Sequence, residues 1–176
     1  AREYVATVRT AVAPIERLRT SPENYGSEPR PPVLLVHGFL ASPDVMLPLA
    51  RALVDHGWTR VVRVGYPSFG ITLDEIVRRI GRAVESLSQD GPIDLVGHSL
   101  GGFACRAYLK GIGGDRENGH RVRRFVAIGA PFGGTLLYRF APPGIREALD
   151  PQGPWVRGLA YGPEPVPTRV VRAAYD

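Results

Sequence analysis

The stretch that decides the fold is residues 93–102, IDLVGHSLGG, where a short apolar run leads into a G-x-S-x-G pattern. The run at 93–96 predicts a buried strand, and the residues that follow predict a short helix to about Leu109. Glycines two positions before and after Ser99 leave room for a very sharp strand-to-helix turn. Such a turn holds the serine hydroxyl above the sheet and puts the next backbone N–H groups at a helix N-terminus, where negative charge is stabilised. The pattern therefore predicts that Ser99 is a nucleophile.

Strands and helices alternate on both sides of this turn. Residues 33–36, VLLV, form a continuous apolar run that is typical of a strand buried on both faces. Helices are predicted over 42–57, with Ser42 as N-cap, and over 72–87, with Thr72 as N-cap. Further strands are predicted at residues 60–66, 124–128 and 169–174. This alternation predicts an α/β fold, with a mostly parallel, doubly wound sheet and helices on both of its faces.

A chain of 176 residues fits one domain with a sizeable core. We expect an N-terminal extension over residues 1–32, followed by the core over residues 33–176. Residues 111–121 predict a surface loop, because they are rich in glycine and charge. Residues 132–168 are rich in proline and glycine, and two interpretations stay open for them: a mobile lid over an apolar pocket, or an excursion that covers the sheet edge.

The composition excludes several classes of protein. Hydrophobic residues make up 44% of the chain, too many for a disordered protein, and no apolar run approaches the ~20 residues that cross a bilayer. Cys105 is the only cysteine, which excludes a disulfide scaffold and predicts a small buried side chain. The net charge of +5 comes from arginines spread along the chain, so we expect no nucleic-acid partner. Such a field still attracts an anionic or interfacial substrate. The arginines are densest beside a predicted strand, at Arg121, Arg123 and Arg124.

A second loop, residues 37–40 (HGFL), follows directly after the strand at 33–36. Carboxyl ends of parallel strands meet at one sheet edge, so this loop is expected to lie near Ser99. An oxyanion hole needs two N–H donors aimed at one point. We predict the backbone N–H groups of Phe39 and Leu100 as these donors, with Gly38 allowing a close backbone approach. His37 is expected to orient the loop through hydrogen bonds.

Three motifs carry a resemblance to a known family: VLLVHGFL at 33–40, GHSLGG at 97–102 and GAPFGGT at 129–135. They resemble the α/β-hydrolase superfamily and, within it, the small bacterial lipases and related esterases. The resemblance covers about residues 33–176. It implies an ester hydrolase with Ser99 as nucleophile, acting on acylglycerols or simple carboxylic esters, and it implies no metal or organic cofactor. It also implies that residues 129–135 lie near an acyl pocket.

The resemblance implies a triad that runs serine, then an acid, then histidine along the chain. Asp176 is the candidate acid, because it is the only acidic residue after the predicted strand at 169–174, and Asp150 is an alternative. All the histidines come too early for the base: His37, His56, His98 and His120. We therefore expect that the core lacks its C-terminal part. Since a serine without a base is a poor nucleophile, this polypeptide alone is expected to be nearly inactive.

Other interpretations stay open. If the acyl group of the same acyl-enzyme is transferred to an alcohol or thiol, the protein is an acyltransferase. The missing histidine also permits a non-catalytic binding protein of this fold. Ser99 as an ordinary turn serine is the structural alternative. The expected partner is a hydrophobic ester substrate, contact with a lipid interface is left open, and no transmembrane segment is expected. No signal peptide pattern is visible, which leaves a secreted and a cytoplasmic location both open.

Overall fold

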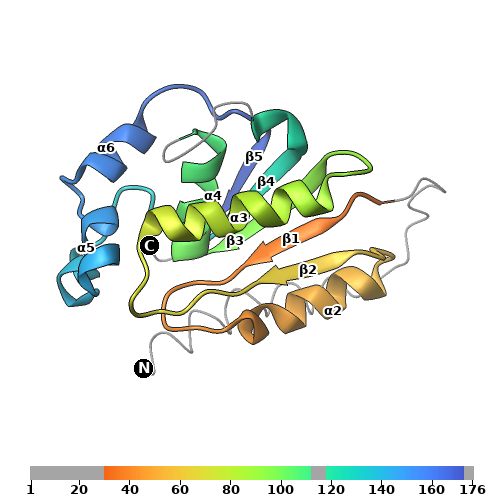
Figure 1. The fold of residues 1–176 in the computed structure, drawn as a ribbon, viewed down its shortest axis with the longest axis horizontal. Helices are drawn as coiled ribbons and strands as arrows, with labels where there is room; N and C mark the ends of the chain where they lie inside the picture. The colour runs from red at the N-terminus through yellow and green to blue at the C-terminus, as the bar shows by residue number, and fades with distance from the viewer. Residues whose placement is uncertain (1–29, 112–117, 173–176) are drawn as a thin grey trace.

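The fold is one five-stranded sheet with helices on both faces (Figure 1). A computed structural model describes residues 30–111 and 118–172. Most of the predicted N-terminal extension, the end of the fifth predicted strand and Asp176 lie outside the described residues. All neighbouring strands pair in parallel, so their carboxyl ends share one edge of the sheet.

The strands run in the order β2-β1-β3-β4-β5 across the sheet. Their bounds are β1 Val33–Val36, β2 Val61–Val64, β3 Ile93–His98, β4 Val122–Ile128 and β5 Thr168–Val171. The α/β fold predicted from the sequence is confirmed, with small shifts in the strand ends. The strand predicted at 60–66 ends at Val64, because Tyr66 leaves the ladder and bonds to His37 on the loop after β1.

Eight helical segments lie between the described strands. Their bounds are η1 Pro43–Met46, α2 Leu47–Asp55, α3 Leu73–Leu87, α4 Leu100–Leu109, η2 Asn118–Arg121, η3 Leu136–Phe140, α5 Pro143–Leu149 and α6 Pro154–Ala160. Ser42 caps η1, and Thr72 forms a capping box with Glu75 at the start of α3. Both predicted N-caps are therefore present. The helices α5 and α6 were not predicted.

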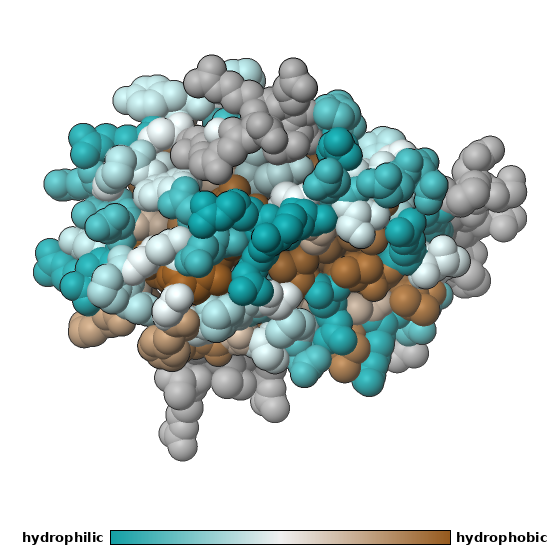
Figure 2. Space-filling view, in the orientation of Figure 1, coloured by the Kyte–Doolittle hydropathy of each residue, from teal (hydrophilic) through white to brown (hydrophobic). Residues whose placement is uncertain are grey.

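Alternate strand residues face two different layers, as the pleat requires. Leu34 and Val36 point into the larger core with α3 and α4, while Val33 and Leu35 point into a smaller core with α2. The helix α3 is strongly amphipathic, and Figure 2 shows its hydrophilic outer face crossing the molecule beside hydrophobic surface over β1 and β2. The helix α4 differs, because nearly all of its residues are buried.

The helices α5 and α6 lie beyond the carboxyl ends of β1 and β2 (Figure 1). Their inward side chains Ile145, Leu149, Val156 and Leu159 are buried in the same core as α3 and α4. This packing favours the interpretation in which the segment covers the sheet edge. The short η3 is different, since Leu136, Leu137 and Phe140 leave most of their surface exposed to solvent.

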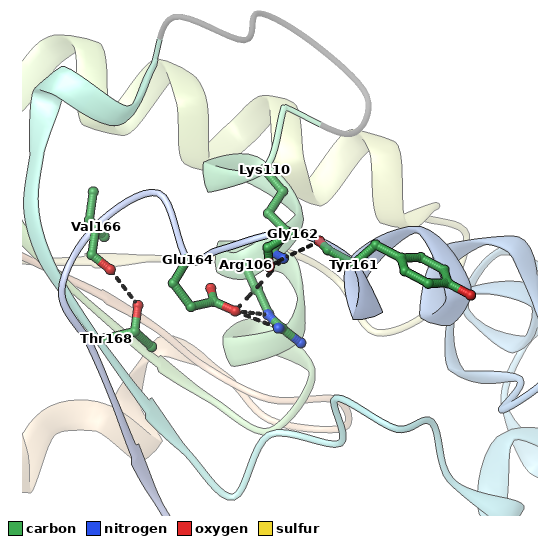
Figure 3. A network of polar contacts seen from close by, with 7 residues as sticks. All are labelled: Arg106, Lys110, Tyr161, Gly162, Glu164, Val166 and Thr168. Carbon is green, nitrogen blue, oxygen red and sulfur yellow. Dashed lines mark hydrogen bonds and ion pairs between the residues drawn. The ribbon is translucent and has the colours of Figure 1, made fainter.

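A polar network fastens the segment between α6 and β5 to helix α4 (Figure 3). Arg106 donates to one carboxylate oxygen of Glu164 through both Nε, at 2.9 Å, and a second guanidinium nitrogen. Lys110 donates to the backbone oxygens of Tyr161, at 2.7 Å, and Gly162. Lys110 Nζ also lies 3.8 Å from Glu164. Helix α4 therefore determines where this connection crosses the molecule before it enters β5.

Candidate active site

Ser99 stands where β3 ends and α4 begins, in a strained backbone conformation. Its φ of 51° and ψ of −122° lie where non-glycine residues are rarely found, and its side chain makes no capping hydrogen bond to the helix. Its backbone N–H donates to the Ile128 oxygen on β4 at 2.9 Å, which fixes the turn against the sheet. The residue is half-buried. An ordinary N-cap serine has an extended backbone and a bonded hydroxyl, so this position differs from one.

Glycine is required on both sides of the turn because the chain passes over itself there. A Cβ built on Gly97 would lie 2.6 Å from the Cα of Gly102, and one built on Gly101 would lie 2.5 Å from the Val36 oxygen. Real Cβ contacts are essentially never this short. The spacing read from the sequence therefore has a steric cause in the structure: α4 starts directly against the ends of β1 and β3.

The structure brings the loop after β1 against this turn, as predicted. A Cβ built on Gly38 would lie 2.9 Å from the Cβ of Ser99 and 3.1 Å from Nδ1 of His98. Phe39 is half-buried, with its ring edge-on to Phe69 at a centroid distance of 6.1 Å. Leu40 follows with a positive φ of 54° and is 60% exposed. The loop therefore reverses sharply just after its contact with Ser99.

His37 is fully buried and uses both ring nitrogens. Its Nδ1 lies 2.8 Å from the Gly38 oxygen, and its Nε2 accepts the backbone N–H of Tyr66 at 3.3 Å. The imidazole stacks on the Tyr66 ring, with centroids 4.2 Å apart. Burial lowers the pKa of His37, opposed by the bond to the Gly38 oxygen. A neutral ring held at both nitrogens is suited to orienting the loop, as predicted, and poorly suited to moving protons.

The other histidines are placed differently. His98 is buried beside Gly38, and desolvation together with the nearby His37 lowers its pKa. His56 bonds through Nδ1 to the Ala52 oxygen on α2 at 2.7 Å. His120 is exposed in η2, directly before β4, and so at the opposite edge of the sheet from Ser99.

The candidate acids give no triad among the described residues. Asp176 lies outside them, and Asp150 accepts the Gln152 N–H at 2.9 Å in the turn after α5. The buried carboxylate of Asp94 was not predicted from the sequence. It bonds to Arg123, at 2.9 and 2.8 Å, and forms an ion pair with Arg124 at 3.0 Å. Because Asp94 is the second residue of β3, it lies at the far edge of the sheet from Ser99. The dense arginine cluster is thus partly neutralised within the fold.

Arg106, on the helix that begins after Ser99, is a second residue that the sequence did not single out. Its guanidinium lies over the ring of Phe132, 4.5 Å from the centroid, in the loop that follows β4. The motif at 129–135 is therefore tied to α4, the helix that begins at Ser99. A signal for this role was present in the sequence, since Arg106 is the one charged residue in an otherwise apolar helix.

The described residues hold no group of three or more histidine, cysteine, aspartate or glutamate side chains arranged to bind a metal ion. Cys105 is buried, and desolvation raises the pKa of its thiol. Among the described helices, none has both the length and the apolar character needed to cross a membrane.

A comparison with family models matched residues 33–176 to the model described as the alpha/beta hydrolase family. A search of curated proteins found no match.

Several solved structures share the fold of this chain at low sequence identity. Phospholipase PlaB from Legionella pneumophila superposes with a TM-score of 0.69 and 17% identity, over 82% of this chain and 39% of its own. Mature lipase BlEst2 from Bacillus licheniformis has a TM-score of 0.66 and 15% identity, over 86% and 68%. Lipase B from Aspergillus fumigatus has a TM-score of 0.66 and 23% identity, over 86% and 39%. These likenesses show the fold, and the chain spans only 39% of the phospholipase and of the Aspergillus lipase.

Proposed function

Because the chain belongs to the alpha/beta hydrolase family, we propose that it is a serine hydrolase that cleaves carboxylic esters of lipids or other hydrophobic molecules. The observation that carries the proposal is the strained, half-buried Ser99 at the start of α4, with Gly38 pressed against it. Lipases and a phospholipase among the structural neighbours are consistent with this substrate class.

In the proposed reaction the Ser99 hydroxyl oxygen attacks the ester carbonyl carbon. The negative charge that forms on the carbonyl oxygen is stabilised by the backbone N–H groups of Phe39 and Leu100. The alcohol leaves, and water then releases the acid from the acyl-enzyme. The first amides of α4 have no partner within their own helix, which suits them to this role.

The reaction also needs a general base and an acid that orients it. His37 is unsuited to the base, because its Nε2 already accepts an N–H and its pKa is lowered. We propose that the base is a histidine elsewhere in the full-length gene product and that Asp176 is the acid. Residues 1–176 alone are then expected to have little activity.

Exposed apolar side chains lie in several loops at the carboxyl edge of the sheet. Leu40 follows β1, Phe69 follows β2, and η3 follows β4, so all three apolar exposures extend from one edge. Phe140 is 86% exposed and Leu136 is 77% exposed. Side chains this exposed, beside an exposed Arg139, fit contact with a lipid surface that delivers the ester.

A fluorophosphonate probe tests the nucleophile in the full-length gene product. We expect one labelled site, mapped by mass spectrometry to Ser99 and lost in Ser99→Ala. Absence of labelling in the folded protein contradicts the proposal and favours a binding protein. Product analysis with a competing alcohol then separates hydrolysis from acyl transfer.

Vesicle flotation tests the lipid contact. We expect the triple variant Leu136→Ser, Leu137→Ser, Phe140→Ser to lose vesicle binding and to keep its activity on a soluble short-chain ester. Val54→Ser is the matched control, because Val54 is 55% exposed on α2, away from this edge. Equal binding by both variants contradicts the lipid contact.

A further inference from the structure

We propose that Tyr66 and a neutral His37 form a clamp that aims the Phe39 N–H into the space beside Ser99 where the oxyanion of the proposed reaction forms. The proposal rests on the proposed function, since it assigns to Phe39 an oxyanion donor. The clamp joins the residue that follows β1 to a residue just beyond β2, and both side chains are buried.

The protonation state of His37 follows from its partners. A backbone N–H only donates, so the Tyr66 N–H requires a lone pair on His37 Nε2. The proton of a neutral ring must then sit on Nδ1, where it is donated to the Gly38 oxygen at 2.8 Å. A doubly protonated ring would break the bond from the Tyr66 N–H, and the other neutral tautomer would break both bonds.

The bond to the Gly38 oxygen also determines the direction of the Phe39 N–H. These two groups belong to one peptide unit, which is planar, and in a trans peptide the C=O and the N–H point in opposite directions. The described residues contain no cis peptide bond. Holding the Gly38 oxygen on the His37 ring therefore turns the Phe39 N–H to the other side of the loop.

Tyr66 holds the preceding peptide unit in the same way. Its hydroxyl donates to the His37 backbone oxygen at 2.5 Å, while its ring stacks on the imidazole with an interplanar angle of 16°. Two consecutive peptide units of the loop are therefore fixed by one tyrosine and one histidine. Gly38, between them, lies against Ser99.

Histidine spectra test the clamp without activity. Two-bond ¹H–¹⁵N spectra at pH 7 are expected to show His37 as the neutral Nδ1–H tautomer. Tyr66→Phe is expected to speed amide exchange of Phe39 about tenfold relative to Tyr108→Phe. Tyr108 is the matched control, since it is also buried but packs against Gly81 of α3. The opposite tautomer, or equal exchange in both variants, overturns the clamp.

Kinetics of the full-length gene product test the link to catalysis. Removing an oxyanion donor lowers kcat by about 10²–10³, so a misdirected donor in Tyr66→Phe should lower kcat about tenfold with KM within about twofold. His37→Asn, which keeps a donor near the Gly38 oxygen, should retain more kcat than His37→Phe. Equal kcat in Tyr66→Phe and Tyr108→Phe, with Ser99→Ala inactive, overturns the inference alone. Full activity in Ser99→Ala overturns the proposed function instead, and the spectra still decide the clamp.

Discussion

Gly38 and Ser99 touch so closely that a Cβ atom on the glycine would lie 2.9 Å from the serine Cβ. One residue follows β1 and the other follows β3, and these strands pair directly in the sheet. The contact therefore joins the two predicted parts of the site, the hydroxyl and the loop that offers an amide, without any intervening side chain.

Gly38→Ala is predicted to abolish at least about 90% of the ester hydrolysis by the full-length gene product, because the added methyl group pushes the loop away from Ser99. The control is Gly133→Ala in the loop after β4, where a Cβ would meet nothing within 4 Å. Esterase assays and thermal melts of both variants check this. Full activity of Gly38→Ala would contradict the assigned geometry.

Ser99→Gly is predicted to be more stable than Ser99→Ala by about 1 kcal/mol, because glycine tolerates a φ of 51° and alanine does not. The control is Ser86, which is exposed in α3. There Ser86→Ala should be more stable than Ser86→Gly, because alanine is the better helix former. Urea unfolding of the four variants measures the difference. A more stable alanine at position 99 would show that the turn is unstrained.

Arg106→Met is predicted to lower the free energy of unfolding by about 1–3 kcal/mol, because it leaves the half-buried Glu164 without its main partner. Arg63→Met, which breaks the exposed pair with Asp44, should change it by less than about 1 kcal/mol. A double-mutant cycle with Glu164→Gln should show a coupling above about 0.5 kcal/mol between Arg106 and Glu164. Additive effects would contradict the network.

Stability is predicted to fall as the pH drops below about 6.5. Burial lowers the folded pKa of both His37 and His98 below the ordinary value of 6.5. In the window between the folded and unfolded pKa values the unfolded chain binds more protons, so stability decreases with falling pH by at most about 1.4 kcal/mol per pH unit for each group. Well above pH 6.5 both imidazoles are neutral in the folded and in the unfolded chain, so this contribution is constant there.

Urea unfolding at pH 7.5 and 5.5 measures this effect. We expect the difference between the two pH values to shrink in His98→Asn, which removes one of the two groups. An unchanged difference would mean that the buried imidazole of His98 does not control the loss.

Sequence patterns predicted most of the sheet and its large helices. The run at 33–36 and the apolar stripe of α3 are local signals, and Thr72 with Glu75 marks the start of α3 within four residues. The helices α5 and α6 were missed because each has only seven residues, too few to show periodicity. Pro143 and Pro154 at their first turns were the available signal.

Only the parts of the candidate site that lie in sequence motifs were predicted. Ser99, Gly38 and the loop of Phe39 come together as the spacing and strand order required. Two contacts join distant parts of the chain, that of Tyr66 with His37 and that of Arg106 with Glu164. No local sequence pattern predicts such pairs. Whether Phe39, Leu100 and Asp176 act as proposed stays a prediction.

The close packing of helix α4 has a consequence for how the proposed site would accommodate different substrates. Its residues are almost all enclosed by other elements, and Ser99 is attached to its first turn. Ser99, the proposed nucleophile, therefore stands at the end of a helix that is packed on nearly all sides. In the proposed function, adjustment to ester substrates of different width would then come from the outer segments, above all η3, where Leu136, Leu137 and Phe140 are mostly exposed.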